Sequence, residues 1–135
     1  MKESLILEIK GYQNDPEFTL HHIAPLMHTI NAKALNILQK DTSLQDSMHK
    51  EIKIAVGATV RTACRRVKAT ATCPMLLDAA DMISNLTLHW EHTAKNILWE
   101  DYRAGLLDVT AKHLPAQPMT ATEKGPGQGS ACSDG

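Results

Sequence analysis

The sequence predicts an all-α fold, a small helical bundle that occupies residues 1–114. Between Leu26 and Leu114 the chain holds one proline and two glycines. Apolar residues recur at helical spacing almost throughout this stretch, and no part of it alternates as a strand does. A length of 135 residues is that of one domain. We therefore expect a short N-terminal helix, two medium helices and one long C-terminal helix.

The N-terminal part contains the first two predicted helices. Residues 2–10 form the short one, which Gly11 ends. The second helix begins at Asp15, an N-cap residue that is followed by Pro16 in the first turn. Its apolar face holds Leu20, Ile23, Met27, Ile30, Ala34, Ile37 and Leu38. Pro25 lies inside this stretch and predicts either a kink or a true helix start after a single turn.

The other two predicted helices cover the rest of the bundle. One spans residues 44–68, and the long one spans residues 74–113, starting at a proline that fits a first helical turn. The apolar stripe of the long helix loses its phase beyond Leu98. That loss predicts either a bend near residues 99–105 or a second partner surface there.

Residues 115–135 differ in composition from the bundle. They are rich in Pro, Gly, Ser and Thr, and they lack a periodic apolar face. Their glycine cluster has no flanking strand or helix that would make it a phosphate-binding loop. We expect a disordered C-terminal tail.

Composition and charge exclude several classes of protein. The formal net charge is −1, which argues against a nucleic-acid coat without sequence preference. No apolar stretch reaches membrane-spanning length, and Glu3 and Glu8 interrupt the N-terminal run, so we expect no secretory signal. Three cysteines form no disulfide-scaffold pattern, which favours a cytoplasmic location.

A surface on the off-phase part of the last helix is the first candidate site. It consists of Trp99, Tyr102, Arg103 and Leu106, which point away from the main apolar stripe. Exposed aromatic rings beside an arginine are typical of an anchor in a protein interface. The alternative is that the N-terminal helix covers these side chains within the chain.

A basic helix is the second candidate site. The residues concerned are Lys50, Arg61, Arg65, Arg66 and Lys68. A helix with an apolar back and a basic front can lie along phosphates. Residues 74–108 carry six acidic residues, however, and an antiparallel neighbour of that kind could pair with the basic helix within the chain or across a dimer.

Histidines and cysteines provide weaker signals. His89 and His92 lie three residues apart on one helix, but no metal-binding signature accompanies them, and a solvated helix face is the simpler interpretation. Cys73 precedes a helix, where a thiolate would be stabilised, and Cys64 lies nine residues before it, which leaves a regulatory dithiol open. We find no nucleophile motif and no paired acidic motifs on two helices, so we predict neither catalytic residues nor a cofactor.

These observations predict a non-enzymatic cytoplasmic adaptor, regulator or inhibitor that acts by binding another protein through a helical surface. The alternative is a dimeric regulator that binds nucleic acid through the basic helix. A homodimer is expected because a long last helix would leave apolar surface uncovered.

Overall fold

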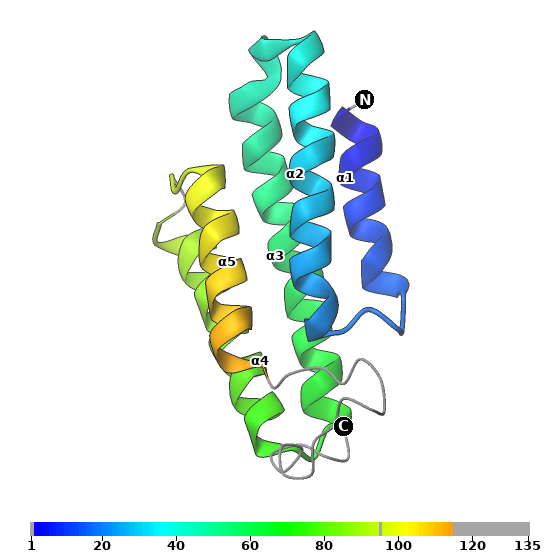
Figure 1. Cartoon of the computed structure of the whole chain (residues 1–135), viewed down its shortest axis with the longest axis vertical. Helices are drawn as coiled ribbons and strands as arrows, with labels where there is room; N and C mark the ends of the chain where they lie inside the picture. Colours follow the sequence, from blue (N-terminus) through cyan, green and yellow to red (C-terminus); the bar gives the residue numbers. More distant parts are fainter. Residues whose placement is uncertain (1, 95, 115–135) are drawn as a thin grey trace, which may run out of the picture.

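The computed structural model of the chain is a bundle of α-helices (Figure 1). It describes residues 2–94 and 96–114, so the expected disordered tail at residues 115–135 lies outside the described part. Five α-helices occur within that part, joined by loops and by three short 3₁₀ turns. The helices are α1 (Lys2–Gly11), α2 (Ile23–Lys40), α3 (Gln45–Thr70), α4 (Pro74–His92) and α5 (Trp99–His113). The 3₁₀ turns are η1 (Tyr12–Asn14), η2 (Leu20–His22) and η3 (Thr42–Leu44). The all-α bundle predicted from the sequence is confirmed.

Helix α3 occupies the centre of the bundle. It packs against α1, α2, α4 and α5, and its contact with α4 is the most extensive in the molecule. Consecutive helices alternate in direction, as the ribbon shows (Figure 1). Helices α1 and α3 therefore run the same way, with Lys2 bonded to Glu51 near one end and the Thr59 hydroxyl donating to the Ile9 carbonyl farther along. Between its contacts with α1 and α4, α3 carries the exposed side chains of Lys50, Ile54 and Arg65, which together are called the open face of α3.

The sequence left two alternatives for the second helix, a start at Asp15 with a kink at Pro25 or a true start close to Pro25. Residues 15–18 form a turn, in which an Asp15 carboxylate oxygen accepts from the Glu17 N–H at 2.9 Å. Helix α2 begins only at Ile23, which places Pro25 in its first turn. A first-turn proline costs no intrahelical hydrogen bond, because the N–H groups of that turn have no acceptor within the helix. The start at Asp15 is wrong, and the start associated with Pro25 is confirmed.

The prediction of one long helix over residues 74–113 is wrong. Helix α4 ends at His92, the chain reverses over residues 93–98, and α5 returns along α4 and α2. In the reversal the N–H groups of Thr93 and Ala94 both donate to the His89 carbonyl, at 2.8 and 3.0 Å. The shift in apolar phase beyond Leu98 is therefore the beginning of a separate helix. The uncovered apolar surface behind the dimer prediction is covered by the chain itself, and a homodimer stays a prediction without that support.

The core is aliphatic, with aromatic rings concentrated between α4 and α5. Gly105 allows α5 to approach α4, and Gly57 allows α3 to approach both of them. A Cβ at Gly105 would lie 2.7 Å from two ring carbons of Trp90. A Cβ at Gly57 of α3 would lie 3.3 Å from the Tyr102 hydroxyl and 3.1 Å from an Arg61 nitrogen. Within the described residues, no helix combines the length and the apolar character that crossing a membrane requires.

Candidate functional site

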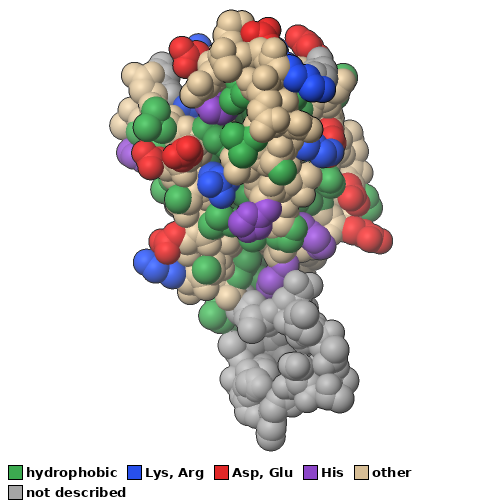
Figure 2. Space-filling model, turned by 45° about the horizontal axis from the view of Figure 1, so that its top comes forward, with side chains coloured by type: hydrophobic (Ala, Val, Ile, Leu, Met, Phe, Trp, Pro, Cys, Tyr) green, Lys and Arg blue, Asp and Glu red, His purple; other side chains and the backbone are tan. Residues whose placement is uncertain are grey.

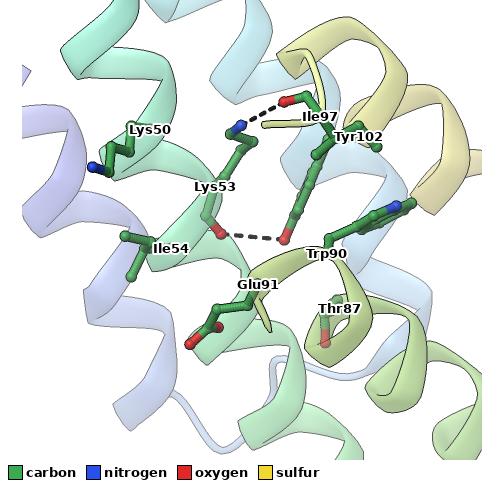
Figure 3. Close-up of a pocket in the computed structure, with 8 residues that line it drawn as sticks. All are labelled: Lys50, Lys53, Ile54, Thr87, Trp90, Glu91, Ile97 and Tyr102. Carbon is green, nitrogen blue, oxygen red and sulfur yellow. Dashed lines mark hydrogen bonds between the residues drawn. The ribbon is translucent and has the colours of Figure 1, made fainter. Parts of the chain in front are cut away.

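A cleft of about 120 Å³ lies between α3, the last turns of α4 and the beginning of α5 (Figure 3). Its lining residues come from both sides of the chain reversal. They are Lys50, Lys53, Ile54, Thr87, Trp90, Glu91, Ile97 and Tyr102. The chain reversal at residues 93–98 is what brings Ile97 and Tyr102 to the same place as α3.

The interior of the cleft is apolar, and its aromatic side chains are held by contacts between helices. The rings of Trp90 and Tyr102 pack with their centroids 4.6 Å apart and their planes inclined by 40°. The Tyr102 hydroxyl donates to the Lys53 carbonyl oxygen at 3.2 Å, which joins α5 to α3 (Figure 3). Burial raises the pKa of Tyr102, so the phenol stays neutral. At the edge, Ile54 is 50 % exposed, which is comparable with Leu35 at 54 % and less than Leu7 at 68 %.

Charged groups of both signs surround the cleft, but only some of them have a partner within the chain. Glu91 accepts from an Arg61 nitrogen at 2.7 Å, and Arg61 also donates to the Thr87 hydroxyl at 3.2 Å. The Lys53 ammonium donates to the Ile97 carbonyl. Burial lowers the pKa of Lys53, and the positive charge of Lys50 lowers it further. Lys50 itself is exposed, and no acidic side chain of the described residues pairs with it.

The structure places the predicted aromatic interface in the core. Trp99, Tyr102 and Leu106 are 4 %, 2 % and 0 % exposed. The expectation that they form an exposed surface is wrong, because α5 packs this face against α2, α3 and α4 instead of leaving it to α1. The indole N–H of Trp99 donates to the Asn31 side-chain oxygen of α2 at 3.0 Å. Arg103 is half-buried, so within this group only Tyr102 lines the cleft.

The basic helix meets the acidic helix within the chain. Arg61 pairs with Glu91, and Lys68 pairs with Asp81 at 2.6 Å, as expected for antiparallel α3 and α4. These contacts confirm the interpretation that the two helices complement each other electrostatically. Arg66 has a different role, because it donates to the backbone carbonyls of Gln13 and Asp15 in the segment after α1.

Two positions of the basic helix keep their charge exposed to solvent without an acidic partner in the described part of the chain. Lys50 is one, and Arg65 is the other, whose guanidinium donates only to the Thr62 hydroxyl of its own helix at 3.1 Å. Figure 2 shows Lys and Arg side chains interspersed with Asp and Glu over one face of the molecule rather than gathered by sign. The exposed positive charge of α3 that lacks an acidic partner among the described residues is therefore confined to Lys50 and Arg65 and does not form an extended basic surface.

The histidines and cysteines occupy separate places. His89 and His92 are exposed, and no group of three potential ligands suited to a metal ion occurs among the described residues. Cys64 is a buried free thiol whose pKa is raised by burial to about 12, so it is protonated at neutral pH. Cys73 is buried at the N-cap position of α4, and because Cys64 is free, no disulfide joins the two.

Several lining residues were not singled out by sequence reasoning. Lys53 and Glu91 counted only among the basic and acidic residues of their helices, and Ile97 as part of the apolar stripe of the long helix, because Ile97 reaches α3 only through the chain reversal. Ile54 did give a signal, since it lies off the buried stripe that contains Ile52 and Ala55.

Comparison with known proteins finds no matching family, no matching curated protein and no matching solved structure. The fold and the cleft are therefore described from this chain alone. Any function must be inferred from the shape of the cleft, its apolar lining and the charges at its edge.

Proposed function

We propose that the protein is a non-enzymatic binding protein, of the adaptor, regulator or inhibitor type, that recognises a protein partner through the open face of α3. The observation that carries the proposal is the apolar cleft, with the half-exposed Ile54 at its edge. Protein interfaces concentrate their binding energy where one anchor side chain fills a desolvated pocket.

The dimensions of the cleft support a single anchor. A cavity of about 150 Å³ is known to hold one benzene molecule. At about 120 Å³ the cleft suits one aliphatic or aromatic side chain rather than a large cofactor. Leu98, which follows Ile97 in the chain, is 68 % exposed and adds apolar surface beside the end of α4.

The polar groups of the cleft favour binding over catalysis. Tyr102 and Lys53 both donate to backbone carbonyls, and Glu91 is held by Arg61. A catalytic acid or base must reach the proton that it transfers, and its pKa is matched to that task. These three groups are instead engaged in joining α3 to α4 and α5.

The test compares two substitutions that place a charge at a half-exposed aliphatic position. Ile54→Glu changes the cleft, and Leu35→Glu changes α2, where Leu35 is 54 % exposed. Each biotinylated variant is used to capture proteins from an extract of the cells that make the chain, with quantitative mass spectrometry as the readout. Thermal unfolding of both variants checks that they fold.

We expect a specific partner that the unchanged protein captures to fall by about tenfold or more with Ile54→Glu and to persist with Leu35→Glu. Equal capture by all three proteins contradicts the proposal. Anisotropy titrations with duplex DNA and single-stranded RNA accompany the experiment. Tight binding that weakens steeply with salt and survives Ile54→Glu would favour a nucleic-acid partner instead.

A further inference from the structure

The open face of α3 carries a pattern of charge and apolar surface that extends beyond the cleft. Lys50, Ile54 and Ala58 are spaced four residues apart on this face, and Arg65 follows two turns after Ala58, beyond Arg61 and Thr62; Lys50, Ile54 and Arg65 are exposed, and Ala58 is half-buried. Residues four apart on a helix are neighbours, about 6 Å apart at their Cβ atoms. Arg65 lies 11 positions after Ile54, which corresponds to about three turns, or about 16 Å. The strip therefore has cations at its two ends, apolar side chains at Ile54 and Ala58, and a half-buried polar turn at Arg61 and Thr62.

The charge at the cleft end of the strip is positive. Glu91 is the only acidic residue in the lining, and its carboxylate is bonded to Arg61 at 2.7 Å. Lys50 is exposed and forms no hydrogen bond or ion pair within the described residues. A carboxylate that binds Lys50 would therefore not have to displace an acidic side chain from it.

We infer that the occupant of this face is an acidic peptide segment of the partner, with an apolar side chain in the cleft, one carboxylate at Lys50 and another at Arg65. This inference rests on the proposed function and specifies the chemistry of the partner. Ala58 supports it, because a small side chain between the two ends lets a peptide backbone lie close to α3. About five residues of extended peptide cover the distance from Ile54 to Arg65.

Two other occupants would use only part of the strip. A free apolar acid, such as a short fatty acid, has the same chemistry at Lys50 and the cleft but is too short to reach Arg65. A nucleic-acid backbone pairs with both cations but has no group for the cleft at Ile54. The roles of Arg65 and Ile54 therefore separate the three cases.

The experiment uses labelled synthetic peptides of about 12 residues, long enough for the whole strip. Each has a central Leu, and the flanking residues are all Glu, all Gln or all Lys. Fluorescence anisotropy measures binding to the full chain and to Lys50→Glu, Arg65→Glu and Lys112→Glu. Lys112 is the matched control because its side chain is 67 % exposed in the last turn of α5, away from the strip. Hexanoate, followed by NMR, serves as the free acid.

We expect the Glu peptide to bind at least about tenfold more tightly than the Gln peptide, and the Lys peptide not to bind. Lys50→Glu and Arg65→Glu should each weaken the Glu peptide by about tenfold, whereas Lys112→Glu should change it by less than about twofold. The inference is overturned if the Gln peptide binds as well, if all three variants weaken binding equally, or if only hexanoate binds. It is also overturned if Arg65→Glu has no effect.

Failure of this inference is distinguishable from failure of the proposed function. If the partner no longer binds Ile54→Glu but still binds Lys50→Glu and Arg65→Glu, the cleft is the binding site, and the inference of an acidic peptide segment is wrong. If the partner still binds Ile54→Glu, both the proposed function and the inference of an acidic peptide are wrong.

Discussion

The two sides of α3 differ in how their charged residues are used. On the side that faces α4, Arg61 pairs with Glu91, and Lys68 pairs with Asp81. On the open side, Lys50 and Arg65 carry the same kind of charge with no acidic partner in the described part of the chain. One helix thus presents paired cations to a neighbour and unpaired cations to solvent. Charge alone does not tell which cations hold the fold together and which are available to another molecule.

The apolar residues show the same contrast. Toward α4 and α5, Gly57 leaves room for the Tyr102 hydroxyl, and Gly105 of α5 leaves room for the Trp90 ring of α4. On the open face, Ile54 is left half-exposed. We expect substitutions on the first side to reduce stability and substitutions on the second to change binding. Four predictions test this difference, in decreasing order of their effect on stability.

Trp99→Ala should have the largest effect. The indole is 4 % exposed, donates to Asn31 and stacks on the Tyr102 ring at a centroid distance of 6.0 Å. Truncation of a buried tryptophan lowers the free energy of unfolding by about 3–5 kcal/mol. Urea denaturation measures the loss. If Trp99→Ala instead leaves stability unchanged and abolishes partner capture, the ring belongs to the binding surface and the comparison fails.

Gly105→Ala should come next. Its Cβ would lie 2.7 Å from two carbons of the rigid Trp90 ring, so either α5 or the ring must move. Overpacking of this kind costs about 1–3 kcal/mol. The matched control is Gly11→Ala, because no atom lies within 4 Å of a Cβ there and the backbone at Gly11 is helical, with φ −59° and ψ −29°. We expect that control to be neutral or to stabilise the protein by up to about 1 kcal/mol, and equal losses at both glycines would contradict the close approach of α4 and α5.

The two ion pairs between α3 and α4 should differ in strength. Arg61 and Glu91 have side chains 15 % and 33 % exposed, and Arg61 also binds Thr87. A double-mutant cycle with Arg61→Ala and Glu91→Ala should give a coupling of about 1–2 kcal/mol. The same cycle on Lys68 and Asp81, whose side chains are 51 % and 54 % exposed, should give coupling too small to resolve. Equal couplings would show that burial does not distinguish the pairs.

Lys50→Gln and Arg65→Gln should have the smallest effect on stability. Both side chains are exposed on the open face, so each change should alter the free energy of unfolding by no more than about 0.5 kcal/mol. Urea denaturation of the two variants, at low and at physiological salt, measures this. A clear loss of stability would mean that these cations hold the fold together and are not available to a partner.

Much of the secondary structure was predictable from local patterns. The buried stripe of α3, with Met48, Ile52 and Val60, follows the helical period, and Pro74 begins α4 as its restricted backbone favours. Pro25 marked the start of α2 as one of two open alternatives. The sequence also supplied both partners of the basic and acidic pairing, although it left open whether they meet in one chain.

The candidate site was much less predictable. The apolar stripe loses phase beyond Leu98, but a phase shift is equally compatible with a bend and with a chain reversal. Because the chain reverses, Trp99 and Tyr102 become core and Ile97 comes to the cleft. Burial of those rings depends on α2 and α3, which lie tens of residues earlier in the chain.

The sequence by itself determined the all-α class and most of the helical segments, since helical periodicity, proline position and capping act within a few residues of one another. Only the tertiary structure decided the direction of α5, which cations are paired and where the cleft lies. Those features depend on contacts such as Arg61 with Glu91 and Tyr102 with Lys53, which join residues 30 and 49 positions apart. Contacts at such separations form only when whole helices pack, so no local pattern encodes them.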